Sequence, residues 1–128
     1  MNVVDTSAWL EYFGDGPNAS EFAAAIEVPA ELVVPTLTVF EVFKRTCQIA
    51  DEASALDAIA VMLQGEVVDL NSALSLDAAR ISLDTGLAMA DSIILATARS
   101  REAVLWTQDA HFEGLAGVEF RPKQQRSG

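Results

Sequence analysis

The residues best suited to chemistry in this sequence are four acids that lie far apart along the chain: Asp5, Glu41, Asp91 and Asp109. Two unit charges about 4 Å apart repel by roughly 4 kcal/mol at an effective dielectric of about 20, whereas a helix cap contributes only about 1 kcal/mol. Four carboxylates gathered in one place would therefore need protons or a cation among them. Hard oxygen ligands suit Mg²⁺ or Mn²⁺, and a chain with one histidine and one cysteine is poorly suited to zinc.

Two of the acids follow expected strands. Asp5 ends the apolar segment 2–4, and Asp109 comes shortly after the apolar segment 103–106. The residues behind each acid read as the start of a helical turn. Both acids are therefore expected at the carboxyl end of a strand.

The other two acids lie in the first turns of expected helices. Glu41 belongs to a helix over 38–50 that follows the strand 32–35, and Asp91 opens a helix over 90–101. In a right-handed crossover the helix runs antiparallel to its strands, so helix N-termini and strand C-termini share one edge of the sheet. That is also the edge at which open α/β sheets bind ligands. We expect all four acids to meet there.

The remaining pattern predicts a doubly wound, three-layer α/β/α domain over residues 1–120, with a central parallel sheet of about five strands. The other elements expected are strands 66–70 and 118–120 and helices 6–13, 54–64 and 73–84, with a further helix capped by Asn18. Helix 73–84 cannot be the crossover between the third and fourth strands, so it should lie across the sheet edge. Residues 121–128 have almost no apolar content, which predicts a disordered basic tail.

Composition narrows the class of protein. The 128 residues are 51% hydrophobic, enough for one domain with a core. The formal charge of -11, from 19 acidic and 8 basic side chains, argues against indiscriminate binding to a nucleic-acid backbone. No apolar run approaches the roughly 20 residues that cross a bilayer, and the N-terminus lacks the features of a signal peptide. The sequence predicts a soluble, cytoplasmic protein with no membrane contact.

Two hydroxyls accompany the acids of the strand ends. Ser7 lies two residues after Asp5, and Thr107 lies two residues before Asp109. Such hydroxyls can orient a ligating carboxylate or a water molecule, and plain capping explains them equally well.

Each acid also has an ordinary structural explanation. Asp5 and Asp109 can be helix N-caps, and Glu41 can form a capping box with Thr38. Asp91 can simply favour the positive end of its helix. These explanations account for an acid near each helix start, but not for four starts on one edge of one pocket.

Other conspicuous residues are assigned structural roles. His111 has no serine or cysteine nucleophile in a recognisable setting, so a structural or surface role is favoured. Five aromatic residues have spacings typical of core packing: Trp9, Phe13, Phe40, Phe43 and Trp106.

At these residues the sequence resembles the PIN domain, and specifically the toxin nuclease of VapBC-type toxin-antitoxin pairs. The matching segments are 3–8 (VVDTSA), 41–42 (EV), 87–98 (LAMADSIILATA) and 105–112 (LWTQDAHF). The resemblance implies a Mg²⁺- or Mn²⁺-dependent endoribonuclease that is inhibited by a cognate antitoxin and is commonly dimeric. It assigns Asp5, Glu41 and Asp91 to the acidic core and Asp109 to a more variable fourth acid, and it matches Ser7 and Thr107 to frequent hydroxyl positions. Family members often have a basic residue where this chain has Gln108.

The hypothesis is therefore metal-assisted hydrolysis of an RNA phosphodiester, with outer contacts from Arg80, Arg99 or Arg101. A haloacid dehalogenase-type phosphatase would need a second aspartate two residues after Asp5, where Ser7 stands. A second alternative is a non-catalytic module whose acidic face docks a basic partner, such as an antitoxin tail. Metal-dependent RNA cleavage that EDTA stops would separate these possibilities.

Overall fold

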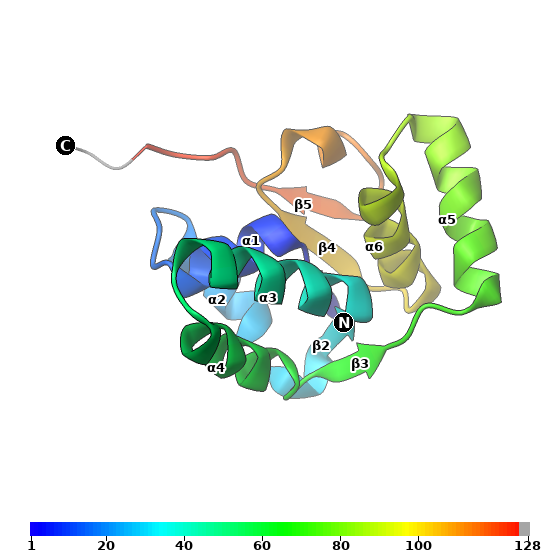
Figure 1. The fold of residues 1–128 in the computed structure, drawn as a ribbon. Helices are drawn as coiled ribbons and strands as arrows, with labels where there is room; N and C mark the ends of the chain where they lie inside the picture. Colours follow the sequence, from blue (N-terminus) through cyan, green and yellow to red (C-terminus); the bar gives the residue numbers. More distant parts are fainter. Residues whose placement is uncertain (126–128) are drawn as a thin grey trace.

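A computed structural model describes residues 1–125 and contains a five-stranded parallel sheet (Figure 1). The strands are β1 (Asn2–Val4), β2 (Leu32–Pro35), β3 (Glu66–Val68), β4 (Val104–Thr107) and β5 (Val118–Phe120). Their order is β3-β2-β1-β4-β5, so β1 is central, and every neighbouring pair is parallel. The predicted fold class is confirmed. β4 is displaced by one residue from the prediction, and β3 is two residues shorter because the chain leaves the sheet edge at Asp69.

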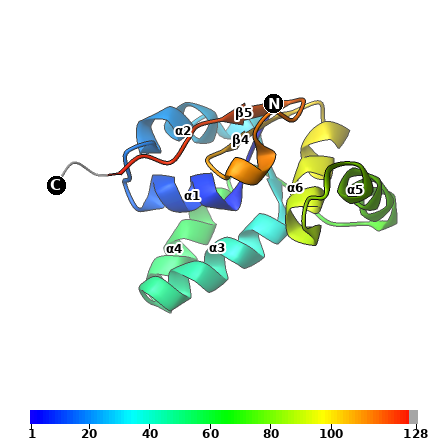
Figure 2. The same ribbon diagram turned by 90° about the horizontal axis from the view of Figure 1, so that it is seen from above.

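One face of the sheet is covered by α6 (Met89–Ser100), on which α5 (Ser72–Thr85) packs (Figure 2). Every residue from 92 to 98 is buried, because α6 lies between the sheet and α5. This explains why that segment is apolar without alternation. The prediction that the 73–84 helix lies across the sheet edge is wrong, since α5 lies alongside α6 and shares its core through Leu74, Ala78 and Ile81.

The other face packs against α1 (Thr6–Phe13), α2 (Ala19–Ile26), α3 (Thr36–Ile49) and α4 (Glu52–Met62). The largest fully buried side chains there are Trp9, Phe22 and Met62. Alternate residues of β1 point to the two cores, with Val3 on the α5–α6 side and Val4 on the α1–α4 side. The three layers hold β1, which Asp5 directly follows, at the centre of the domain.

The helices of this second layer bury different faces from those predicted. The helix expected from residue 38 begins at Thr36, and the buried positions of α3 are Thr38 and Val42. Phe40 lies two residues from each of them, about 200° around the helix, and is 61% exposed. Its predicted place in the core is therefore wrong.

α4 shows the same kind of error. It runs over Glu52–Met62 instead of 54–64 and buries Ala55, Ala58 and Met62. The larger Leu56 and Leu63, which lie seven residues apart within the range predicted from the sequence, are exposed. Small side chains face the core here because α4 packs closely on α3.

Two residues that follow β5, Arg121 and Pro122, contact the rest of the domain. Arg121 forms ion pairs with Glu21 and Glu119 and lies over the Trp106 ring, 5.4 Å from its centroid. The Pro122 carbonyl accepts a hydrogen bond from Asn18. Residues 126–128 of the predicted tail lie outside the described residues.

No single helix within residues 1–125 is both long and apolar enough to cross a bilayer. Only α5 and α6 together reach that length and composition, and they are bent by 116°.

Candidate metal and active site

Asp5 leaves β1 as the N-cap of α1 and is buried, with 3% of its surface exposed. One oxygen, Oδ2, accepts hydrogen bonds from the Ser7 hydroxyl at 2.7 Å, the Thr107 hydroxyl at 3.0 Å and the Ser7 amide at 3.3 Å. Within residues 1–125 no hydrogen bond reaches Oδ1. The capping explanation of Asp5 and Ser7 is thus correct, and it leaves one carboxylate oxygen for another partner.

Thr107 connects the ends of β1 and β4. Its hydroxyl donates to Asp5 and accepts from the Asp109 amide at 2.9 Å. The Ser7 hydroxyl lies 3.3 Å from it and accepts from the Gln108 amide at 3.3 Å. Asp109 then caps a 3-10 turn, Ala110–Phe112, by accepting from the His111 amide. This network fixes the spacing of the two strand-end acids.

Asp91 lies in the first turn of α6 and is half-buried, and the N-cap position, Ala88, offers no side-chain cap. Burial raises the pKa of Asp91 to about 6 from its usual 3.8. Three further carboxylates raise this pKa by charge repulsion: Asp5, Asp109 and Glu41. The four sequence-predicted acids therefore lie close enough together to interact electrostatically.

The pKa of Asp5 is raised as well. Burial raises its pKa above 3.8, the hydrogen bonds from Ser7 and Thr107 oppose the rise, and the charge of Asp109 adds to it. In both acids burial is the larger cause of the rise, and repulsion from neighbouring carboxylates adds to it.

Glu41 comes to the cluster from α3. Its Oε1 accepts a hydrogen bond of 2.6 Å from the Thr6 hydroxyl at the start of α1. The capping-box explanation is wrong, because the Thr38 hydroxyl donates to the Pro35 carbonyl and Glu41 bonds to Thr6 instead. Glu41 is held by packing of α3 on α1, which its local sequence does not reveal.

His111 also belongs to this edge, although the sequence favoured only a structural or surface role for it. Its side chain is 77% exposed, and Nδ1 lies 2.9 Å from Oδ1 of Asp109. Candidate ligand atoms of Asp91, Asp109 and His111 lie within 4.8 Å of one another. A hollow of about 250 Å³ borders both Asp91 and His111. The sequence feature that could have placed His111 at this edge is its position in the turn immediately after Asp109.

The donor set fits a hard divalent cation. Asp91 and Asp109 offer ligand atoms within 4.8 Å of each other, Asp5 and Glu41 repel Asp91 electrostatically, and Asp5 keeps an oxygen free of hydrogen bonds within the described residues. A cation there would offset the repulsion, as Mg²⁺ and Mn²⁺ do with oxygen ligands.

The basic residues that the sequence suggested as outer contacts to RNA make other interactions, away from the four acids. Arg80 pairs with Asp77, and Arg101 pairs with Glu66. Arg99 donates to the Ala116 carbonyl at the end of α6 opposite to Asp91. Eight residues of helix separate the two, about 12 Å.

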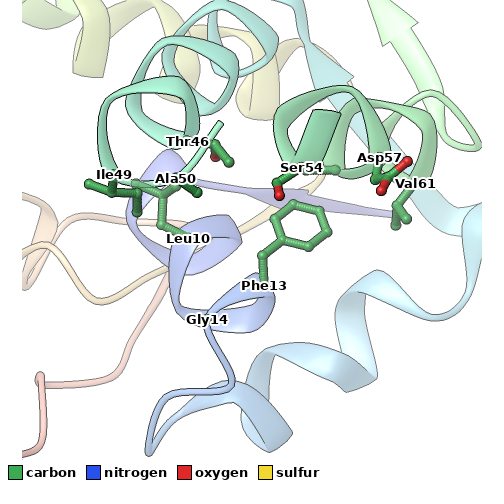
Figure 3. Close-up of a pocket in the computed structure, with 10 residues that line it drawn as sticks. Leu10, Phe13, Gly14, Thr46, Ile49, Ala50, Ser54, Asp57 and Val61 are labelled. Atoms are coloured by element: carbon green, nitrogen blue, oxygen red, sulfur yellow. The ribbon is translucent and has the colours of Figure 1, made fainter. Parts of the chain in front are cut away.

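An apolar groove opens on another side of the domain, between α1, α3 and α4 (Figure 3). Its volume is about 480 Å³. Most of the lining is apolar and comes from Leu10, Phe13, Ile49 and Val61, with Asp57 at its border.

The sequence matches the PIN domain family over residues 3–118. The chain belongs to the PIN domain family. The match contains all four acids and both hydroxyls of the candidate site.

Solved structures share this PIN fold over nearly the whole chain. A chain of a toxin-antitoxin complex from Klebsiella pneumoniae has a TM-score of 0.79 at 20% identity, covering 93% of this chain and 96% of that one. VapC20 from Mycobacterium tuberculosis, a sarcin-ricin loop cleaving toxin, has a TM-score of 0.77 at 18% identity, covering 95% and 100%. DNA-bound VapBC from Salmonella typhimurium has a TM-score of 0.71 at 16% identity, covering 95% and 98%. Among curated proteins, no sequence matches this chain.

Proposed function

We propose that this PIN domain is a metal-dependent endoribonuclease that hydrolyses RNA phosphodiester bonds and acts as the toxin of a toxin-antitoxin pair. The observation that carries the proposal is the grouping of acids at one sheet edge: ligand atoms of Asp91 and Asp109 lie within 4.8 Å of each other, and repulsion from Asp5, Asp109 and Glu41 adds to burial in raising the pKa of Asp91 to about 6. Membership of the PIN family and the similarity in fold to VapC20 support it.

In the proposed reaction, Asp5, Glu41, Asp91 and Asp109 hold one or two Mg²⁺ or Mn²⁺ ions. When bound, such ions activate a water molecule and stabilise charge on the phosphate and the leaving oxygen. Ser7 and Thr107 act through Asp5, because their hydroxyls hold Oδ2 and so direct Oδ1 to the cluster. The half-buried position of Asp91 limits the water that would otherwise screen its charge.

The test is cleavage of RNA by the purified protein. Cleavage should require Mg²⁺ or Mn²⁺, stop with EDTA and resume when the ion is restored. Sequencing the 5′ ends of RNA from cells that express the protein would then identify the target. Absence of cleavage on every class of RNA, or cleavage that persists in EDTA, would favour the non-catalytic acidic module.

We also propose a cognate antitoxin that places an amphipathic helix in the apolar groove of Figure 3. Its apolar face would contact Leu10, Phe13 and Ile49, and its flank should be basic because Asp57 borders the groove and the chain carries a net charge of -11. Several structures with this fold are of toxin-antitoxin assemblies.

Co-purification tests the antitoxin proposal. The product of a neighbouring reading frame for a small basic protein should co-purify with the wild type and be lost with Ile49→Glu. Leu56→Glu is the matched control, because Leu56 is similarly exposed, at 55% against 63%, but does not line the groove. Equal retention by both variants would contradict this placement.

A homodimer and a cytoplasmic location remain predictions. Three exposed apolar side chains of α5 and α6 are available for a dimer contact: Leu76, Leu83 and Met89. Sedimentation of the wild type and of Leu83→Glu tests this, since the predicted dimer should dissociate in the variant.

A further inference from the structure

A second groove adjoins Glu41 and differs in chemistry from the acid cluster. It has a volume of about 300 Å³ and is lined by residues of α1 and α3. These two helices pack together and lie side by side in Figure 2. At one end are Thr6 and Glu41, joined by their 2.6 Å hydrogen bond. The rest of the lining is Leu10, Phe40, Lys44, Arg45 and Gln48. The groove therefore leads from a proposed metal ligand onto an aromatic and cationic surface.

Phe40 contributes an aromatic ring that the fold does not bury. It is 61% exposed and lies on the side of α3 opposite the buried Thr38 and Val42. The Lys44 ammonium is 5.9 Å from the ring centroid. Exposed aromatic rings beside cations are the stacking platforms on which proteins bind unpaired bases.

Within residues 1–125, Lys44 and Arg45 are cations without an acidic partner. Among residues 1–125, three other basic side chains are paired with carboxylates: Arg80, Arg101 and Arg121. Lys44 and Arg45 form no such ion pair, although 19 of the 128 residues are acidic, and Arg45 only donates a long 3.4 Å hydrogen bond to Gln48. Their charge remains available for a phosphate.

The spacing connects this surface to the acid cluster. Lys44 and Arg45 are three and four residues after Glu41, so they lie one turn along the same side of α3, about 5.4 Å away. A phosphodiester held at the acids would bring an adjacent nucleotide over the groove.

We propose that this groove binds the nucleotide next to the cleaved bond, with Phe40 stacking on its base and Lys44 and Arg45 contacting phosphates. The substrate at this site is then single-stranded RNA, since bases inside a duplex cannot reach the ring. The inference rests on the proposed nuclease function and assigns part of its specificity to α3.

The probe is a short fluorescein-labelled single-stranded RNA of mixed sequence, compared with the same RNA annealed to its complement. Binding is measured by anisotropy with Mg²⁺ in an Asp91→Asn background, so that the RNA survives. Phe40→Ala should weaken binding about 5-fold or more without changing its salt dependence. Phe40→Leu should show most of that loss, because it keeps the apolar contact but removes the ring.

Lys44→Gln/Arg45→Gln should also weaken binding. It should reduce the slope of log Kd against log salt concentration by about 1.4, as expected for two phosphate contacts on a single strand. The matched control, Arg80→Gln/Arg101→Gln, changes the net charge equally but should leave the slope unchanged. Cleavage assays in the wild-type background should show the groove variants with a raised KM.

The outcomes separate the two proposals. If the wild type neither binds nor cleaves RNA with Mg²⁺, the nuclease function and the groove both fail. If the wild type cleaves RNA while the groove variants keep its affinity and KM, the groove alone fails. Equal binding of duplex and single strand overturns it, as does an effect of the groove variants on self-association or antitoxin capture without any effect on RNA.

Discussion

The acid at the end of β1 and the acid at the start of α6 are stabilised in different ways. Asp5 is buried, and one of its oxygens accepts three hydrogen bonds from Ser7 and Thr107. Asp91 is half-buried, has no side-chain hydrogen bond within residues 1–125 and faces the charges of three other carboxylates. Hydrogen bonds within the protein orient the strand-borne acid, whereas under the proposed function a cation would orient the helix-borne acid and offset its charge.

The largest effect should come from removing either charge. Asp5→Asn and Asp91→Asn should each lower RNA cleavage at saturating Mg²⁺ by roughly 1,000-fold, because several kcal/mol of charge stabilisation would depend on the ion that they are proposed to hold. Asp77→Asn is the control, an exposed acid paired with Arg80. If Asp5→Asn retained full activity, Asp5 would be only a helix cap and the comparison would fail.

Removing the hydroxyls that orient Asp5 should have a smaller effect. Ser7→Ala and Thr107→Val should each reduce metal affinity or cleavage about 10- to 100-fold, as is typical for partners that orient metal ligands. Ser75→Ala serves as control, because that exposed hydroxyl donates to the Asn71 carbonyl within α5. Titration of cleavage against Mg²⁺ distinguishes weakened metal binding from a slower step, and unchanged Mg²⁺ dependence would contradict a positioning role.

The stability of the folded protein should depend on pH because of Asp91. The pKa of Asp91 is about 6 in the folded protein and 3.8 in the unfolded chain, so the folded state binds the proton more tightly. Without metal, stability should therefore fall as pH rises from about 4 to about 6, and stay lower above that. A shift of about 2 pH units corresponds to about 3 kcal/mol, which solvent screening of this half-exposed group reduces to about 1 kcal/mol.

Denaturant unfolding at pH 5 and pH 7.5 measures this loss. Asp91→Asn should lack most of it and be the more stable protein at pH 7.5 in EDTA, and added Mg²⁺ should reverse that order. Asp5→Asn should gain less, since the hydroxyls of Ser7 and Thr107 lose their carboxylate acceptor. Identical pH profiles for the wild type and Asp91→Asn would contradict the raised pKa.

The smallest effect is expected at Thr6. Thr6→Val removes the 2.6 Å hydrogen bond to Glu41 and should raise the Mg²⁺ concentration needed for half-maximal cleavage about 5-fold, the value of one hydrogen bond at a partly exposed site. Thr6→Ser should restore the wild-type value. Failure of the serine variant to do so would mean that the methyl group, through packing, is what matters.

The sequence predicted the sheet and the meeting of the acids because parallel topology determines both. A residue at the end of β1 or β4 must lie on the edge where α3 and α6 begin. The buried face of each helix is harder to predict from sequence. The apolar residues around α3 do not form one stripe, and packing of α3 against α1 and the sheet leaves Phe40 exposed to solvent. The partner of Glu41 and the position of His111 depend on contacts between separate elements, which local patterns do not encode.

The central position of β1 has a consequence for synthesis. Asp5 and Thr107 are joined by a hydrogen bond but are separated by 102 positions, and β1 pairs with β4 along its whole length. Because a ribosome makes the chain from the N-terminus, the first strand must wait for nearly all the others before it acquires its second neighbour. An incomplete nascent chain therefore lacks an assembled acidic centre, and a translating ribosome is not exposed to the proposed nuclease until the domain has been made.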